Sequence, residues 1–348
     1  MDRYQIYEQT EKANHAGSKA VLDVCSIANE MMFKEESMVM HSNKPGIINK
    51  IIRQLYFLKD QKRIFKDISN DSFILLQHPL YFRQLHRDQF FLNLKKKKNA
   101  KFISLVHDVY ELRTKEPDDY FKHEFDFMCQ FSDMIIVHNK VMMDYLIKKG
   151  VEAEKLICLE IFDYLIPNYK YVAPSFSKKI VIAGNLNPNK SAYLKELYSL
   201  DVQFELFGPN FDESINKSQN IHYNGSLPAD EVPNALTTGF GLIWDGLTTE
   251  TCSGDFGEYL KYNNPHKLSL YLSSGLPVII WAKAAEAEFV KKYNLGFAVN
   301  SLNEIPAIFN TLTEDKYCNM ANNVKDIASK LTSGYFTKKA ITRAINKL

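Results

Sequence analysis

The chain has 348 residues, of which 45% are apolar, 24% charged and 13% aromatic, enough for one large or two ordinary domains with hydrophobic cores. This composition excludes a disordered chain, a collagen-like chain and a small disulfide-stabilised scaffold. Lysine and arginine together number 43 against 41 acidic residues, a net charge of +2. Dedicated nucleic-acid binders carry a larger basic excess, so we expect no nucleic-acid partner and a local site for any anionic ligand.

The cysteines and the apolar segments indicate the cellular compartment. The cysteines form no CxxC pair and have no histidines at ligand spacing, which predicts reduced thiols and no metal site. No apolar run approaches the roughly 20 residues of a spanning helix, and Met1–Tyr4 lacks the pattern of a signal peptide. We expect a cytoplasmic protein, at most peripheral at the inner face of the membrane.

Short apolar runs alternate with amphipathic stretches along the chain. A short candidate strand at Tyr4–Tyr7 precedes seven such runs: Ser72–Gln77, Lys101–His107, Asp133–His138, Lys179–Ala183, Gln203–Phe207, Phe240–Trp244 and Pro277–Trp281. Strands without alternation are buried on both faces, as in parallel sheets. The helical stretches include Lys140–Lys149, Ser191–Leu200 and Pro265–Ser274. This order predicts doubly wound α/β domains.

A composition shift marks a domain boundary. Two prolines and several polar residues interrupt the pattern at Pro167–Ser177, before a new strand at Lys179. We therefore predict one domain over residues 1–168 and a second over residues 169–331. Residues 332–348 read as a basic amphipathic helix that packs back on the first domain.

Gly184–Ser191 (GNLNPNKS) is a candidate anion site because it joins a strand to a helical pattern. Unpaired backbone amides, the helix dipole and Lys190 would together attract a phosphate. The segment nearly matches the pattern GxxxxGK[ST], but Asn189 replaces the second glycine. An ordinary turn with a solvated lysine is one alternative. The other is a nucleoside triphosphatase that uses Asp245 as a magnesium ligand.

The segment Tyr262–Gly275 contains a second candidate anion site. Asn264 before Pro265 predicts an N-cap followed by proline at the first helical position. His266 and Lys267 then lie in the first turn, where the helix dipole disfavours cations unless an anion is bound. A diphosphate site is therefore favoured over a capped helix that happens to be basic.

The block Thr238–Trp281 resembles the donor-binding half of bacterial glycosyltransferases, the group of β-1,6-galactofuranosyltransferases and streptococcal adhesin glucosyltransferases. The resemblance continues at Leu105–Val109 (LVHDV), Gly184–Asn185 (GN) and Gly334–Ala340 (GYFTKKA), and covers almost the whole chain. It implies a GT-B fold, in which two Rossmann-like doubly wound α/β domains face a central cleft. It also implies a UDP-sugar donor, a glycan, glycolipid or glycoprotein acceptor, and neither metal nor cofactor.

The resemblance assigns roles to residues of the second half. Gly184, Asn185 and Lys190 line the diphosphate, and Lys267 contacts a phosphate. Asn264 and His266 contact the phosphates or the donor sugar. Tyr223 contacts the nucleoside, and Asp245 binds a ribose or sugar hydroxyl.

His107 and Asp108 end a strand of the first domain, where GT-B enzymes often direct a residue at the transferred sugar or the acceptor. An inverting transfer needs a base for the acceptor hydroxyl, and Asp108, His107 or Glu111 could supply it. The alternative makes Asp108 a helix N-cap and His107 a buried strand end. Many retaining GT-B enzymes carry two glutamates eight positions apart. Tyr262 and Leu270 occupy those positions here, which favours inversion.

The acceptor side gives weaker signals. The loop Thr10–Lys19 corresponds to one that faces the cleft in this fold, making Gly17, Ser18 and Lys19 candidate acceptor contacts, with a helix cap as the alternative. Lys95–Lys98 (KKKK) is a candidate contact for anionic lipid, with a solvated loop as the alternative. A homo-oligomer, or a noncatalytic partner subunit of the same shape, is left open.

Overall fold

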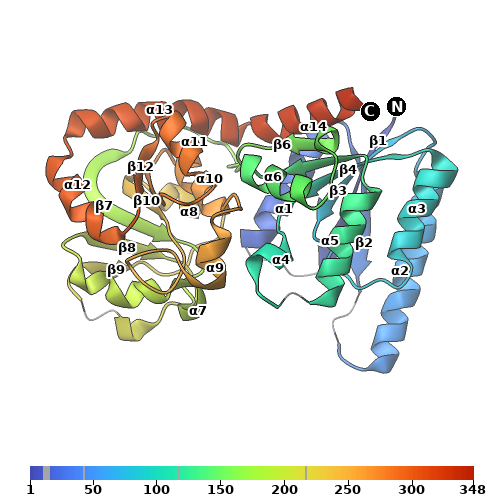
Figure 1. Cartoon of the computed structure of the whole chain (residues 1–348), viewed down its shortest axis with the longest axis horizontal. Helices are drawn as coiled ribbons and strands as arrows, with labels where there is room; N and C mark the ends of the chain where they lie inside the picture. The colour runs from blue at the N-terminus through green and yellow to red at the C-terminus, as the bar shows by residue number, and fades with distance from the viewer. Residues whose placement is uncertain (11–15, 42–43, 117, 216–217) are drawn as a thin grey trace.

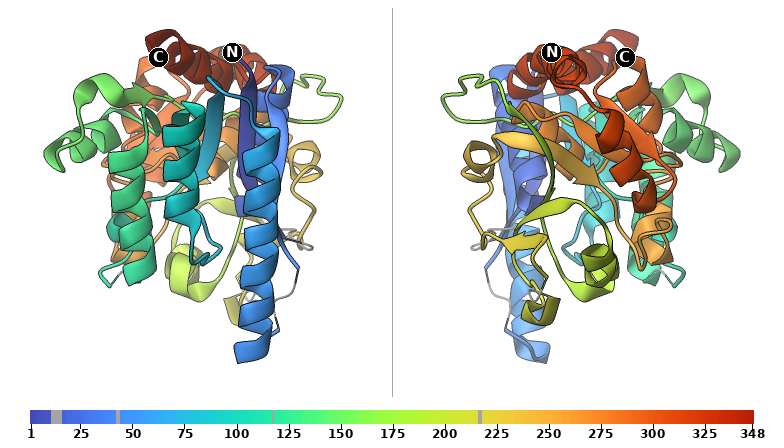
Figure 2. Two further views of the ribbon diagram at one scale, coloured as in Figure 1. Left: turned by 90° about the vertical axis from the view of Figure 1, so that its right-hand side faces the viewer. Right: turned by 90° about the vertical axis from the view of Figure 1, so that its left-hand side faces the viewer.

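The structure is a computed structural model that describes residues 1–10, 16–41, 44–116, 118–215 and 218–348. Two six-stranded parallel sheets flanked by helices lie side by side along the long axis of the molecule (Figures 1 and 2). The doubly wound α/β architecture is therefore confirmed, and it occurs twice.

The first sheet has the strand order β2-β1-β3-β4-β5-β6. Its strands are β1 (Arg3–Thr10), β2 (Lys34–Met40), β3 (Phe73–His78), β4 (Lys101–Val106), β5 (Met134–Val137) and β6 (Leu156–Cys158). The winding direction reverses between β1 and β3. The loops that follow these two strands diverge, which leaves a crevice at the carboxyl edge of the sheet, the usual position for a ligand.

The second sheet has the order β12-β11-β10-β7-β8-β9, the Rossmann arrangement. Its strands are β7 (Ser175–Ala183), β8 (Gln203–Phe207), β9 (Ile221–Tyr223), β10 (Thr238–Ile243), β11 (Val278–Trp281) and β12 (Gly296–Val299). Here the winding reverses between β7 and β10. The predicted anion loop follows β7, and Asp245 follows β10.

Helices connect the strands. In the first half they are α1 (Ala16–Glu30), α2 (Ile47–Asp67), α3 (Arg87–Lys98), α4 (Tyr110–Arg113), α5 (Asp119–Phe131), α6 (Lys140–Lys148) and the 3₁₀ turn η1 (Ala153–Lys155). In the second half they are α7 (Pro188–Ser191), η2 (Ala192–Ser199), η3 (Glu213–Ile215), α8 (Val232–Ala235), α9 (Gly254–Tyr259), α10 (His266–Ser273), α11 (Ala287–Lys292), η4 (Leu302–Glu304), α12 (Ile305–Thr311), α13 (Glu314–Thr332) and α14 (Tyr335–Lys347). Among the helices of the described residues, none is both long enough and apolar enough to cross a bilayer.

Every predicted apolar run forms a strand, and the strands that the sequence missed are edge strands. β2, β6, β9 and β12 each have one neighbour only. An edge strand needs less apolar surface, so β2 reads KEESMVM and β6 and β9 span three residues each. β7 begins at Ser175, four residues before the predicted start, because only its last four residues are buried.

Two predicted segments differ in kind from the observed ones. Ser191–Leu200 was expected as an α-helix, and most of it forms the 3₁₀ helix η2. The lysine run Lys95–Lys98, for which a solvated loop was the alternative to a lipid contact, forms the last turn of α3. Its cations there face the carbonyl end of the helix dipole, and the Lys95 ammonium lies 3.0 Å from Asp133.

The helix α14 joins the two halves of the molecule. It follows Gly334, whose φ of +72° ends α13, and it contacts β5, β6 and α1 of the first half. Figure 1 shows α13 and α14 running along one edge of both domains. The carboxylate of Asp163 accepts hydrogen bonds from the amides of Phe336 (3.2 Å) and Thr337 (2.6 Å), which fixes the start of α14. One apolar cluster runs from the second sheet through Ile341 to Val24 on α1.

Buried polar contacts also fix the two sheets relative to each other. The Asn139 amide donates to the Tyr262 carbonyl (3.0 Å) and to the Glu286 carboxyl (2.9 Å). The Asn264 amide N–H donates to His138 Nδ1 at 2.9 Å. Burial raises the pKa of Glu286 to about 8.

This pKa predicts how stability depends on pH. Between pH 4.5, the ordinary value, and about 8, the folded chain keeps a proton on Glu286 that the unfolded chain releases. The free energy of unfolding therefore falls as pH rises through this window. Glu286→Gln cannot ionise at this position. The free energy of unfolding of this variant, relative to that of the wild type, should therefore rise by about 1–3 kcal/mol from the lower to the upper end of the window, as measured by urea unfolding.

The exposed Glu288→Gln on the same helix is the control and should follow the wild-type curve. Parallel curves for wild type and Glu286→Gln would contradict a protonated Glu286.

Candidate active site

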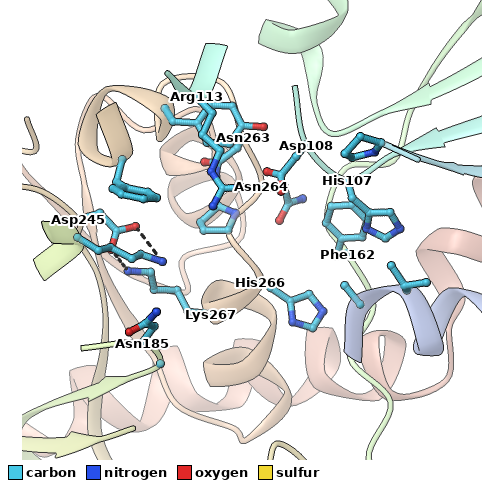
Figure 3. A pocket seen from close by; sticks show the side chains of 18 of the residues that line it. His107, Asp108, Arg113, Phe162, Asn185, Asp245, Asn263, Asn264, His266 and Lys267 are labelled. Carbon is cyan, nitrogen blue, oxygen red and sulfur yellow. Dashed lines mark hydrogen bonds and ion pairs between the residues drawn. The ribbon is translucent and has the colours of Figure 1, made fainter. Parts of the chain in front are cut away.

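A cleft of about 730 Å³ lies between the two sheets and is lined by residues of both. Figure 3 shows side chains from each half pointing into it. Nine predicted site residues line the cleft: His107, Asp108, Gly184, Asn185, Lys190, Asp245, Asn264, His266 and Lys267. The fold therefore brings together residues that lie up to 160 positions apart in the sequence.

The strongest feature of the cleft is a pair of lysines at the switch point of the second sheet. Lys267 Nζ lies 2.7 Å from one carboxylate oxygen of Asp245, and Lys190 Nζ lies 3.9 Å from the other (Figure 3). Lys267 also donates to the Trp244 carbonyl at 2.8 Å. Burial lowers the pKa of Lys267, and the Asp245 carboxylate opposes that effect. Asp245 therefore holds both ammonium groups.

Most backbone amides of the loop after β7, the predicted anion loop, already have acceptors within the protein. The amide of Gly184 donates to Phe207 O (3.0 Å), that of Leu186 to Pro209 O (3.0 Å), and that of Asn187 to Asn185 Oδ1 (3.0 Å). The amides of residues 189–191 donate to Asn187. The helix that follows, α7, is only four residues long. Positive charge at this loop therefore comes from Lys190.

In the described structure, the first turn of α10 has backbone amides without a hydrogen-bond acceptor. Pro265, rather than Asn264, is the N-cap residue, and no side chain caps the helix. Asn264 is instead buried at the domain interface, where its side-chain amide donates to the Glu160 carbonyl (3.2 Å). Among the described residues, the backbone amides of His266 and Lys267 have no protein acceptor. These donors, next to the two lysines, form an anion site at a helix N-terminus.

An uncharged aromatic cluster lies beside this anion site. The Phe162 ring stacks on His107 at 5.2 Å and contacts His266 at 6.3 Å. Burial lowers the pKa of His107 to about 3 and that of His266 to about 4, so both imidazoles are neutral at physiological pH. Within the described chain, His266 Nε2 and Asn264 Oδ1 are buried without a hydrogen-bond partner. Both residues line the cleft, but these two atoms are themselves covered by protein.

Asp108 lies opposite the lysines, at the end of β4. Its carboxylate is 3.1 Å from Arg113 and accepts a hydrogen bond from Tyr259 of α9. Tyr259 in turn accepts from the Val109 amide at 2.9 Å, so α9 holds this loop from across the cleft. Burial raises the pKa of Asp108, against the opposing effect of Arg113.

Sequence reasoning missed Arg113, Tyr259 and Glu8. Arg113 follows Asp108 by five positions and Asp108 precedes α4, so the i,i+3 and i,i+4 spacings of helical pairs gave no signal for this contact. Glu8 lies near the end of β1, at the switch point of the first sheet, and accepts from the amides of Tyr81 (2.6 Å) and Phe82 (3.0 Å). Burial raises the pKa of Glu8 to about 7. Only the strand order shows that β1 and β3 flank a crevice.

Tyr223 and Lys19 do not line the cleft. Tyr223 lies on the edge strand β9, two strands from the switch point, and donates to Gly208 O at 2.9 Å. The Lys19 ammonium contacts Asp23 (3.1 Å) and Asp230 (2.9 Å) and thereby links the two halves. Gly17 and Ser18 belong to the first turn of α1, and residues 11–15 of the predicted acceptor loop lie outside the described residues.

The chemistry of the donor set bears on metal binding. In the part of the chain that the structure describes, no three His, Cys, Asp or Glu side chains gather as a metal site would require. Both carboxylate oxygens of Asp245 face ammonium groups.

Solved structures with the same architecture span the entire chain. HepE from Anabaena, solved in complex with UDP and glucose, has a TM-score of 0.62 at 13% identity and covers 99% of this chain and 100% of its own. The lipopolysaccharide outer core galactosyltransferase WaaB, in its apo form, has a TM-score of 0.62 at 12% identity with the same coverage. At such identities the likeness shows the fold alone, which is GT-B.

Sequence relatives are closer. The β-1,6-galactofuranosyltransferase WbbI of Escherichia coli K12 is 33% identical over 338 residues, covering 96% of this chain and 95% of its own. Glucosyltransferase 3 of Streptococcus gordonii is 29% identical and covers 93% of this chain and 92% of its own. The glucosyltransferase 3-like N-terminal domain matches residues 3–161, and the corresponding C-terminal domain matches residues 180–344. This chain therefore belongs to the glucosyltransferase 3-like family and is a GT-B glycosyltransferase.

Proposed function

We propose that the enzyme transfers a hexosyl group, specifically galactofuranosyl, from a UDP-sugar to a glycan, glycolipid or glycoprotein acceptor. The reaction serves cell-surface polysaccharide or glycoprotein synthesis and takes place in the cytoplasm. The observation that carries this proposal is the convergence of Lys190 and Lys267 beside the open first turn of α10. The choice of galactofuranose rests on the name of the E. coli relative, the more similar of the two described above.

The site suits departure of a nucleoside diphosphate. When the bond between the sugar and the phosphate breaks, negative charge develops on the leaving oxygen. Lys190, Lys267 and the amides of the first α10 turn lie where they would stabilise this charge. We propose that they act in place of a divalent metal ion.

Asp108 is the better supported base. A base must accept the proton of the acceptor hydroxyl as the new bond forms. His107 is a poor acceptor, because its pKa is lowered to about 3 and its Nε2 is hydrogen-bonded to Gln77 at 2.7 Å. The Asp108 carboxylate faces the cleft, and burial raises its pKa, which increases its basicity.

Inversion is supported by the residues around α10. Leu270, at the position of the second glutamate of many retaining GT-B enzymes, is buried in the apolar core. Neither Leu270 nor Tyr262 offers a carboxylate. Direct displacement by an acceptor activated through Asp108 needs none there, and would convert an α-linked donor into a β-linked product.

The phosphate contacts lead to a first test. Lys267→Ala should weaken UDP binding by about 2–3 kcal/mol, roughly 30- to 150-fold, because a charge-assisted hydrogen bond is lost. Lys190→Ala should have a smaller effect, since its ammonium is less buried. Calorimetric titration with UDP measures both. Lys195→Ala, on the neighbouring helix and outside the cleft, is the control, and unchanged affinity in Lys267→Ala would refute this site.

Asp108→Asn tests the base. The amide keeps the size of the side chain but cannot accept the proton, so kcat should fall about 10²- to 10⁴-fold. UDP affinity should stay within about twofold, because Asp108 lies on the opposite wall. The exposed Asp144→Asn is the control, and full activity in Asp108→Asn would remove it as the base.

Donor choice and metal use are tested together. With UDP-galactofuranose, UDP-galactose and UDP-glucose supplied separately, we expect donor hydrolysis or transfer to be fastest with UDP-galactofuranose, with and without EDTA. The anomer of a transfer product, read by NMR, should be β. UDP should also raise the melting temperature equally in EDTA.

Other outcomes point to the alternatives. A melting shift that requires magnesium with ATP or GTP would indicate a nucleoside triphosphatase. Absence of a UDP shift together with absence of transfer would indicate a noncatalytic partner subunit. A faster reaction with UDP-glucose would overturn the choice of galactofuranose alone.

A further inference from the structure

The outer face of α2 is unusually apolar for a surface. Six large side chains on its first half are between 41% and 77% exposed: Ile47, Ile48, Ile51, Ile52, Leu55 and Tyr56. Their spacing puts them on one side of the helix, opposite the buried residues Phe57 and Ile64. Figures 1 and 2 show this end of α2 extending beyond the rest of its domain. Surface patches of this kind mark interaction sites.

The same face becomes basic along the second half of the helix. Lys59, Lys62 and Lys66 continue the apolar stripe at helical spacing and are exposed. Among the described residues, no carboxylate forms an ion pair with these three lysines. The aspartates of α2, Asp60 and Asp67, contact Arg63 on the side toward β2.

The end of α3 extends this basic region. The Lys98 ammonium lies 5.3 Å from the centre of the Phe65 ring, which places the last turns of the two helices side by side. Lys96 and Lys97 in that turn are exposed. We call the six apolar residues of α2 together with Lys59, Lys62 and Lys66 the α2 face.

We propose that the α2 face docks the enzyme on an anionic lipid bilayer. Apolar side chains of such a helix enter the boundary between headgroups and acyl chains, while lysines pair with lipid phosphates. A second copy of the chain is the competing occupant. It fits less well, because a self-complementary contact would leave the lysines of both copies without acidic partners.

The helix α2 packs against a segment that lines the cleft, which relates the docking to the active site. The Gln54 side chain donates to Arg83 O (2.8 Å) and accepts from the Leu85 amide (3.0 Å), and the Phe57 ring stacks on Phe82 at 5.7 Å. Phe82 and Tyr81 line the cleft on the side away from the lysines. A bilayer at the α2 face would therefore lie near the wall that faces the acceptor.

Vesicle binding by the full-length chain tests this inference. Co-sedimentation with vesicles of phosphatidylcholine and phosphatidylglycerol should show binding that weakens at high salt, and vesicles of phosphatidylcholine alone should bind far less. Each lysine near an anionic surface contributes about fivefold. Lys59→Glu/Lys62→Glu/Lys66→Glu should therefore bind on the order of a hundredfold more weakly. Ile48→Ser/Ile51→Ser/Leu55→Ser should also lose binding.

A matched control separates local from overall charge. Lys178→Glu/Lys283→Glu/Lys316→Glu changes the net charge equally but alters exposed lysines of the second half, and should bind as the wild type does. UDP-induced melting shifts, unchanged in all variants, show that folding and the donor site are intact. These shifts also keep a failure of the donor site distinct from a failure of docking.

Two results would overturn the proposal. One is absence of wild-type binding to the anionic vesicles. The other is equal vesicle binding by all variants, with a wild-type dimer in light scattering that the serine variant converts to a monomer. The second result would assign the α2 face to a partner copy.

Discussion

The active site depends on one electrostatic arrangement, in which a single carboxylate holds two ammonium groups at the edge of the second sheet. Without Asp245, Lys190 and Lys267 would repel each other, and burial would favour loss of a proton from Lys267. With Asp245 the cations are in place before any ligand arrives. A preformed charge arrangement needs little reorganisation when negative charge develops during reaction, which is the condition for efficient electrostatic stabilisation.

Topology explains why this arrangement faces the other half of the cleft. Each sheet opens a crevice where its winding reverses, at β7 and β10 in the second sheet and at β1 and β3 in the first. Buried contacts such as Asn139 with Glu286 and Asn264 with His138 hold the halves so that the cleft lies between them. The lysines then line one side, and Glu8 and Asp108 the other.

Between the two sides lies a neutral cluster of Phe162, His107 and His266. A charged imidazole there would compete with the lysines for the diphosphate, whereas neutral rings leave the positive charge at one end of the cleft. The cleft thus places neutral rings beside the paired lysines, while the Asp108 carboxylate has its own cation, Arg113, at 3.1 Å.

The sequence by itself determined the doubly wound α/β class, the interior strands and most of the residues around the cleft. These follow from continuous burial of short apolar runs and from the position of polar residues at strand ends, both of which leave a local pattern. The tertiary structure alone decided the edge strands, whose single neighbour relaxes the apolar requirement, and the loop after β7, whose amides bond to Phe207 and Pro209. It also placed Asn264 against Glu160, Lys19 against Asp230 and Tyr223 away from the cleft. Such contacts join residues far apart in the chain, and residue spacing carries no record of them.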